Sequence, residues 1–224
     1  AVRKSGVPRE EFFLTSKVWI TNAGYEKARA SIDESLKKLQ TDYLDLMLIH
    51  QPFNDYYGTY RAMEDAYRAG KLRAIGVSNF YPDRFIDLYH FVDVKPAVNQ
   101  IETHPFQQQR QAHEILQKYG VQHESWGPFA EGRKDLFQNP VLTGIGGKYG
   151  KSAAQVVLRF LIQSGVVVIP KSTHRERMEE NFSVFDFSLS QEDMAAVQAL
   201  DEGESAFFSH YDPDTVEWFM GLVR

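Results

Sequence analysis

The chain has 224 residues, of which 43% are hydrophobic and 13% aromatic, a balance that is typical of a globular protein and excludes a mostly disordered chain. Its 25 basic and 30 acidic side chains give a net charge of −5, which argues against nucleic acid or an anionic membrane as the main partner. The lack of cysteine excludes disulfides, a thiolate nucleophile and cysteine-based metal sites, and no apolar run is long enough to span a bilayer.

No long linker rich in Gly, Ser or Pro divides the sequence, so we expect a single domain over residues 1–224. Short apolar runs alternate along the chain with stretches of helical periodicity. The expected strands are 12–17, 45–50, 73–77, 97–101, 121–125, 165–169 and, with a weak signal, 185–187. The expected helices are 25–40, 59–69, 82–91, 107–119, 152–164, 174–181 and 190–200.

Alternating βα units with continuous apolar strands predict a parallel sheet covered by helices, either a doubly wound sheet or a (β/α)8 TIM barrel. The barrel is favoured because no Gly-rich turn follows the first strand and because polar side chains gather where the strands end. These side chains are Lys17, His50, Ser78, Asn79, Gln100, Glu102, Lys171 and Ser172. Seven strands are expected where such a barrel has eight, so the fold class is α/β, a TIM barrel with seven of its eight strands in this sequence.

Lys17 and His50 end adjacent strands at equivalent positions. A lysine at a barrel mouth is costly unless it is paired or functional, and a histidine there can donate a proton or polarise a carbonyl. Each residue taken singly also fits a solvent-facing lysine or a hydrogen-bonded core histidine, and Lys17 alone also fits an enzyme that forms a Schiff base. Their equivalent positions favour a shared function.

Amide and hydroxyl side chains also stand at strand ends, in Ser78, Asn79 and Gln100. They suit the carboxamide of a nicotinamide, which both donates and accepts hydrogen bonds, but ordinary loop hydrogen bonding explains them equally well. Trp126, after the fifth strand, offers a flat face to a ring, although a lone tryptophan is more often a core residue.

The segment 169–177 carries several cations and hydroxyls at a predicted helix start, a combination that suits a phosphate. A solvated helix start is the alternative. The run 145–152 nearly matches a phosphate-binding P-loop but has Ile145 at its first glycine position, and a Gly-rich turn followed by a Ser152 cap explains it better. The seven histidines show no ligand spacing, so no metal is expected.

Together these segments resemble the aldo-keto reductase family, in its bacterial form near the diketogluconate reductases. The motifs that carry the resemblance are FFLTSKVW, YLDLMLIHQP, AIGVSNF, VNQIETHP, ESWGPFAEG and VIPKS, in family order. The resemblance implies a TIM barrel that reduces aldehydes or ketones by hydride transfer from NADPH. Lys17 would lower the pKa of a catalytic tyrosine, His50 would orient and polarise the carbonyl, and Trp19, Phe53 and the tail 207–211 would shape the substrate pocket.

Three groups of residues would bind NADPH according to this resemblance. The group on the nicotinamide carboxamide is Ser78, Asn79 and Gln100. The group on the nicotinamide ring and the pyrophosphate is Trp126, Gly127, Pro128, Phe129, Glu131 and Gly132. The group on the adenosine end is Lys171, Ser172 and Arg177 at the 2′-phosphate, with Glu180 and Asn181 at the adenine.

The family also uses an Asp and a Tyr from a first βα unit, and nothing in this chain matches that unit. Tyr25, Tyr56 and Tyr57 stand in the wrong places to substitute. We therefore expect an N-terminally incomplete reductase barrel, inactive as this chain alone. The alternative is a catalytically impaired nucleotide-binding protein of reductase ancestry. We also expect the protein to be a cytoplasmic monomer. Its expected partner is a small carbonyl substrate, and neither nucleic acid nor a membrane is expected as a partner.

Overall fold

The computed structural model describes residues 2–223 as two compact units. Unit 1 consists of Ala1–Asn99 with His210–Arg224, and unit 2 of Gln100–Ser209. None of the described helices has the length and apolar character needed to cross a bilayer.

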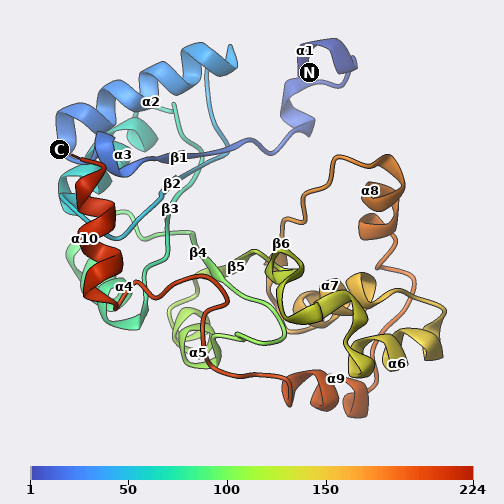
Figure 1. Ribbon diagram of the computed structural model, residues 1–224. Coiled ribbons are helices and arrows are strands. Elements are labelled where there is room, and N and C mark those ends of the chain that lie inside the picture. The colour runs from blue at the N-terminus through green and yellow to red at the C-terminus, as the bar shows by residue number, and fades with distance from the viewer. Residues whose placement is uncertain (1, 224) are drawn as a thin grey trace. The chain divides into compact units, whose positions relative to one another are not determined.

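Unit 1 is built on the parallel strands β1, β2 and β3, followed by the first residues of β4 (Figure 1). Its strands are β1 (Thr15–Val18), β2 (Leu46–Ile49), β3 (Ile75–Ser78) and the start of β4 (Val98–Glu102). Its helices are α1 (Val2–Ser5), η1 (Arg9–Glu11), η2 (Ile20–Asn22), α2 (Tyr25–Leu39), α3 (Tyr56–Arg68), α4 (Pro82–Phe91) and α10 (Pro213–Gly221).

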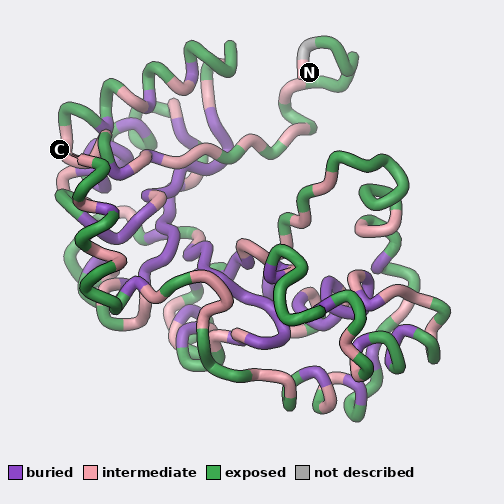
Figure 2. Tube along the Cα trace, viewed as in Figure 1, coloured by how far each residue is buried: buried purple, intermediate pink, exposed green. Residues whose placement is uncertain are grey.

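The core of unit 1 lies on β2 and β3, whose residues are all buried (Figure 2). Helix α2 adds an apolar stripe of Ala28, Ile32 and Leu36 at helical spacing and packs against α3. Gly76 is required in β3 because a Cβ there would come within 2.4 Å of the Val98 carbonyl oxygen, so only glycine lets the two backbones approach. Close strand packing therefore sets the position of the residues that follow β3.

Unit 2 continues with β4, then β5 (Gln122–Trp126) and β6 (Val167–Val168), with β5 and β6 parallel. Its helices are α5 (Arg110–Lys118), η3 (Ala130–Gln138), α6 (Pro140–Tyr149), α7 (Ala153–Gln163), α8 (Arg175–Phe182) and α9 (Gln191–Gln198). Helix α7 begins with a capping box in which the Ser152 hydroxyl accepts from the Gln155 N–H. Its buried face, which includes Val156 and Phe160, packs into the core of the unit.

Six of the seven expected strands occur, and the seventh prediction, residues 185–187, is wrong: the described residues form six strands in all. This segment is an irregular stretch, and it and the residues beside it are held by Arg159 of α7 and by Lys151, which precedes that helix. Arg159 donates to the Val184 carbonyl and the Ser188 hydroxyl, and Lys151 pairs with Asp186 at 2.7 Å. These contacts take the place of a strand partner.

The prediction of a Gly-rich turn at 145–152 is correct for its Ser152 cap and wrong for its first half. Residues up to Tyr149 belong to α6, which no sequence signal had indicated because three glycines lower its helix propensity. The helix forms because the Asn139 side chain caps it by accepting from Val141 N and because its apolar residues pack on α7. Gly150, in the left-handed conformation at φ 64°, ends it.

Candidate active site

In unit 1, Lys17 and His50 lie at the carboxyl ends of neighbouring strands. Lys17 stands opposite Leu48 in the parallel register of β1 and β2, and His50 follows β2 directly. The His50 N–H donates to the Val18 carbonyl at 3.1 Å, and its ring meets the Trp19 ring edge-on at 4.7 Å. The sheet register therefore places an ammonium and an imidazole at the edge where the sequence positions of Lys17 and His50 predicted them, and the indole of Trp19 lies beside the imidazole.

Burial, and to a smaller extent the charge of Lys17, lowers the pKa of His50 to about 4. The imidazole is therefore neutral near pH 7, where it can donate one hydrogen bond without carrying charge. A neutral donor beside a cation is suited to a carbonyl oxygen on which negative charge develops.

Asn79 joins the end of β3 to the end of β2. Its backbone is left-handed, at φ 62°, and its side-chain amide donates to the His50 carbonyl at 3.0 Å. The preceding Ser78 is fully buried. Asn79 therefore holds the backbone of His50 in place, a contact that the sequence did not reveal.

The predicted pocket residue Phe53 lies in an aromatic cluster of unit 1. It stacks on His210, with ring centroids 5.8 Å apart, and packs on Phe219 of α10 at 5.4 Å. His210 Nε2 donates to the Gln51 side-chain oxygen at 2.7 Å, which fixes the ring next to the end of β2. Phe219 was not predicted, because α10 has no motif that marks it.

Three tyrosines elsewhere in unit 1 are poor proton donors. Burial and a hydrogen bond to Asp87 raise the pKa of Tyr57, and burial with the nearby Asp83 raises the pKa of Tyr211 to about 12. The exposed Tyr25 donates to Asp65 at 2.7 Å, and that hydrogen bond raises its pKa as well. Each of the three holds its proton more tightly than an ordinary tyrosine.

In unit 2, Gln100 and Trp126 are held from neighbouring elements. Gln100 is only 1% exposed, and its side-chain amide donates to the carboxylate of Glu124 on β5. The half-buried Trp126 packs on Phe207, with ring centroids 5.2 Å apart. The loop that follows makes two tight turns, with positive φ angles at Gly127, Ala130, Glu131 and Gly132 and a buried Pro128 between them.

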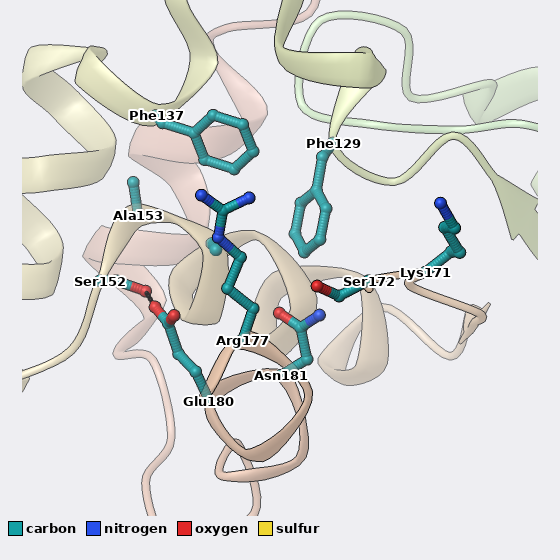
Figure 3. Close-up of a pocket in the computed structure, with 10 residues that line it drawn as sticks. Phe129, Phe137, Ser152, Ala153, Lys171, Ser172, Arg177, Glu180 and Asn181 are labelled. Carbon is teal, nitrogen blue, oxygen red and sulfur yellow. Dashed lines mark hydrogen bonds between the residues drawn. The ribbon is translucent and has the colours of Figure 1, made fainter. Parts of the chain in front are cut away.

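A cavity of about 440 Å³ lies in unit 2 between the start of α7, the segment before α8, α8 itself and the loop after β5 (Figure 3). Its lining residues are Phe129, Phe137, Ser152, Ala153, Ala154, Lys171, Ser172, Arg177, Glu180 and Asn181. Arg177 extends toward Phe137, and Ser172 and Asn181 point toward Phe129. The Glu180 carboxylate accepts from the Ser152 hydroxyl and so joins α8 to the start of α7.

Two cations, two hydroxyls, a carboxylate and two phenyl rings are among the groups that line this cavity. Since the carboxylate of Glu180 already accepts from the Ser152 hydroxyl, the two cations remain for an anionic group attached to a flat ring. Six residues predicted for the cofactor come together here: Phe129, Lys171, Ser172, Arg177, Glu180 and Asn181. Gly127, Glu131 and Gly132 belong to the adjoining loop and do not line it. Phe137, Ala153 and Ala154 were missed, because only the fold brings α7 and the end of η3 to this place.

A family model described as "Aldo/keto reductase family" matches residues 1–202. This chain belongs to the aldo-keto reductase family. It is 48% identical over 204 residues to glyoxal reductase of Bacillus subtilis, covering 91% of this chain and 73% of the relative. The motifs resemble those of bacterial family members, and this relative is a bacterial protein.

Solved aldo-keto reductases confirm the fold. An enzyme from a Medee basin deep-sea metagenome library superposes with a TM-score of 0.90 at 40% identity, over 93% of this chain and 78% of that chain. A Bombyx mori aldo-keto reductase in complex with NADP superposes with a TM-score of 0.87 at 34% identity, over 92% of this chain and 73% of that chain. The chain therefore has the predicted α/β fold of the (β/α)8 barrel family, and the comparisons lend no support to the alternative of a catalytically impaired protein.

The neutral state of His50 in this aldo-keto reductase predicts how its kcat/KM changes as the pH is lowered. Since the pKa of His50 lies at about 4, lowering the pH through 6.5 leaves its ring neutral, and protonation begins only as the pH approaches 4. We expect kcat/KM to show no loss assigned to His50 between about pH 8 and pH 5, the range in which an ordinary histidine titrates.

The measurement is a pH profile of kcat/KM, with the His50 ring followed by NMR. His50→Gln serves as the control, because any titration that persists in this variant belongs to another group. A His50 resonance that titrates near pH 6.5 would contradict the prediction.

Proposed function

We propose that this protein reduces small aldehydes or ketones to alcohols with NADPH. The observation that carries the proposal is the cavity of unit 2, whose lining includes Lys171, Ser172 and Arg177, two cations and a hydroxyl of the kind that binds phosphate. The glyoxal reductase activity named for the Bacillus subtilis relative suggests a small, reactive aldehyde. The NADP named for the Bombyx mori structure supports the coenzyme class.

The residues of the cavity fit the adenosine end of NADPH. Lys171, Ser172 and Arg177 would bind the 2′-phosphate, which NADH lacks, and Asn181 and Phe129 would contact the adenine. Glu180 would act mainly by holding α8 against α7 through Ser152.

The remaining cofactor assignments extend the same proposal. In unit 2, we propose Gln100 and Trp126 as nicotinamide-binding residues and the loop 127–132 as the pyrophosphate-binding segment. For unit 1, we propose that Ser78 and Asn79 suit a carboxamide. When bound, the coenzyme supplies a hydride to the carbonyl carbon.

Lys17 and His50 would act on the carbonyl oxygen. The neutral imidazole donates a hydrogen bond to that oxygen and orients the substrate. The ammonium of Lys17 would stabilise the negative charge that develops on the oxygen. The proton that completes the alcohol would come from the catalytic tyrosine that the family uses and that nothing in this chain matches. Trp19 and Phe53 give the substrate an apolar wall, which favours a small carbonyl compound over a charged one.

The test is NADPH consumption by the purified protein with glyoxal, methylglyoxal and a simple aromatic aldehyde, with NADH as the comparison coenzyme. We expect turnover with NADPH, with the alcohol product identified by mass spectrometry, from a form that also carries the family's Asp and Tyr, and negligible turnover from these 224 residues alone. A protein that neither quenches its fluorescence on titration with NADPH nor consumes NADPH with any of the three substrates would overturn the proposal. We further propose a cytoplasmic monomer, which sedimentation and cell fractionation can test.

A further inference from the structure

In unit 2, several hydrogen-bond donors meet at the carboxylate of Glu102, at the end of β4. It is 3% exposed and accepts three hydrogen bonds. The donors are His104 Nε2 at 2.9 Å, the Ala206 N–H at 2.8 Å and the Ser205 hydroxyl at 2.5 Å. Two of them come from a segment more than a hundred residues further along the chain. A buried carboxylate thus fastens the segment 205–208 to the sheet.

The proton positions in this network follow from its own contacts. Nδ1 of the fully buried His104 accepts from the Phe106 N–H at 3.3 Å, which leaves Nε2 to donate to Glu102. The Ser205 oxygen accepts from both the Phe207 and the Phe208 N–H at 3.0 Å, which uses its lone pairs and leaves its own proton for Glu102. Every donor therefore requires an acceptor at position 102.

The turn held in this way places the side chain of Phe207. Its ring packs on Trp126 at 5.2 Å, and the Arg133 guanidinium lies 4.3 Å from its centroid. Arg133 also donates to the Ala206 carbonyl. The ring lies so close to the loop that a Cβ added at Gly127 would be 3.6 Å from it. Trp126 therefore packs on the ring of Phe207, and Glu102 holds the backbone turn that carries Phe207.

We propose that Glu102 is a positioning residue for hydride transfer, acting through Ser205 and Phe207 to set the indole plane of Trp126. The inference rests on the proposed function, in which Trp126 meets the nicotinamide. Glu102 itself touches neither coenzyme nor substrate in this account. Its influence should fall on kcat, because the orientation of the nicotinamide governs hydride transfer, while Glu102, Ser205, Phe207 and Trp126 are not among the residues that line the proposed phosphate cavity.

Glu102→Gln is the decisive variant because it keeps size and shape while replacing one acceptor oxygen by an NH2 donor. If that NH2 faces the Ser205 hydroxyl, the Ser205 oxygen has three donors around it and its own proton has no acceptor. We expect kcat to fall about 10-fold with a much smaller change in the Kd of NADPH. Amide hydrogen exchange at Ala206, Phe207 and Phe208 should accelerate in the same variant.

Matched variants separate positioning from general destabilisation. Glu204→Gln removes the same charge from an exposed neighbour and should leave kcat and amide exchange unchanged. Ser205→Ala should reproduce the loss in kcat, and Ser205→Thr, which keeps the hydroxyl, should restore it. Should Glu102→Gln fail to fold, the Ser205 pair carries the same comparison.

The possible outcomes are distinct. A parent protein without NADPH-linked turnover defeats the proposed function, and exchange at 206–208 then still tests the anchor itself. In an active parent, unchanged kcat in both Glu102→Gln and Ser205→Ala overturns the inference. A loss of NADPH affinity equal to the loss in kcat also overturns it, because it would indicate a general disturbance of the coenzyme site.

Discussion

Replacing Lys17 with methionine is expected to lower kcat for carbonyl reduction by about 10²- to 10³-fold, with NADPH affinity nearly unchanged. Methionine keeps the length and apolar stem of the side chain and removes only the positive charge. That charge acts on the same region as His50, whose pKa it lowers. Without it, the negative charge that develops on a substrate oxygen held by His50 loses the cation that acts on His50, so the effect falls on the chemical step.

The measurement is steady-state kinetics together with NADPH binding by fluorescence. Lys27→Met, which removes an exposed lysine of α2, is the matched control and should behave as the parent protein. His50→Gln should lower kcat/KM to a similar extent, since the amide cannot reproduce the ring geometry beside Trp19. Turnover equal to that of the parent protein in Lys17→Met would show that Lys17 has no part in the reaction and is only a solvated lysine at a strand end.

Arg177→Ala is expected to weaken NADPH binding about 10-fold while leaving NADH binding unchanged. The guanidinium lines the cavity of unit 2 together with Lys171, and its charge-assisted contacts matter only for a coenzyme that carries the 2′-phosphate. Arg177 is exposed, so solvent screening limits how much its charge strengthens NADPH binding. The preference of the protein for NADPH over NADH should decrease as the salt concentration is raised.

Titration of the protein with each coenzyme measures this selectivity. Arg175→Ala is the matched control: Arg175 lies two residues away, pairs with Glu179 at 2.8 Å and is not among the residues that line the cavity. It should leave both affinities unchanged. Equal Kd values for NADPH and NADH in the parent protein would place the phosphate elsewhere and overturn the assignment of Lys171, Ser172 and Arg177.

Local signals in the sequence determined much of the scaffold. The apolar run that ends at His50 and the strand that carries Lys17 were enough to predict their shared edge, because carboxyl ends of parallel strands meet there. The Ser152 helix cap was predicted correctly, and the cations around Ser172 were predicted to form an anion site that stays a prediction, because each feature spans only a few consecutive residues. Such features depend on backbone geometry within one turn or strand.

Features that join distant segments were decided only by the tertiary structure. Residues 185–187 look like a strand, yet Arg159 and Lys151 of the α7 region bind them as an irregular stretch. Phe137 joins the cavity, and Ser205 reaches Glu102, through contacts that no periodicity encodes. Hydrogen bonding and burial between distant residues depend on how the helices and strands pack, so sequence spacing alone determined which residues were available, and packing decided which of them meet.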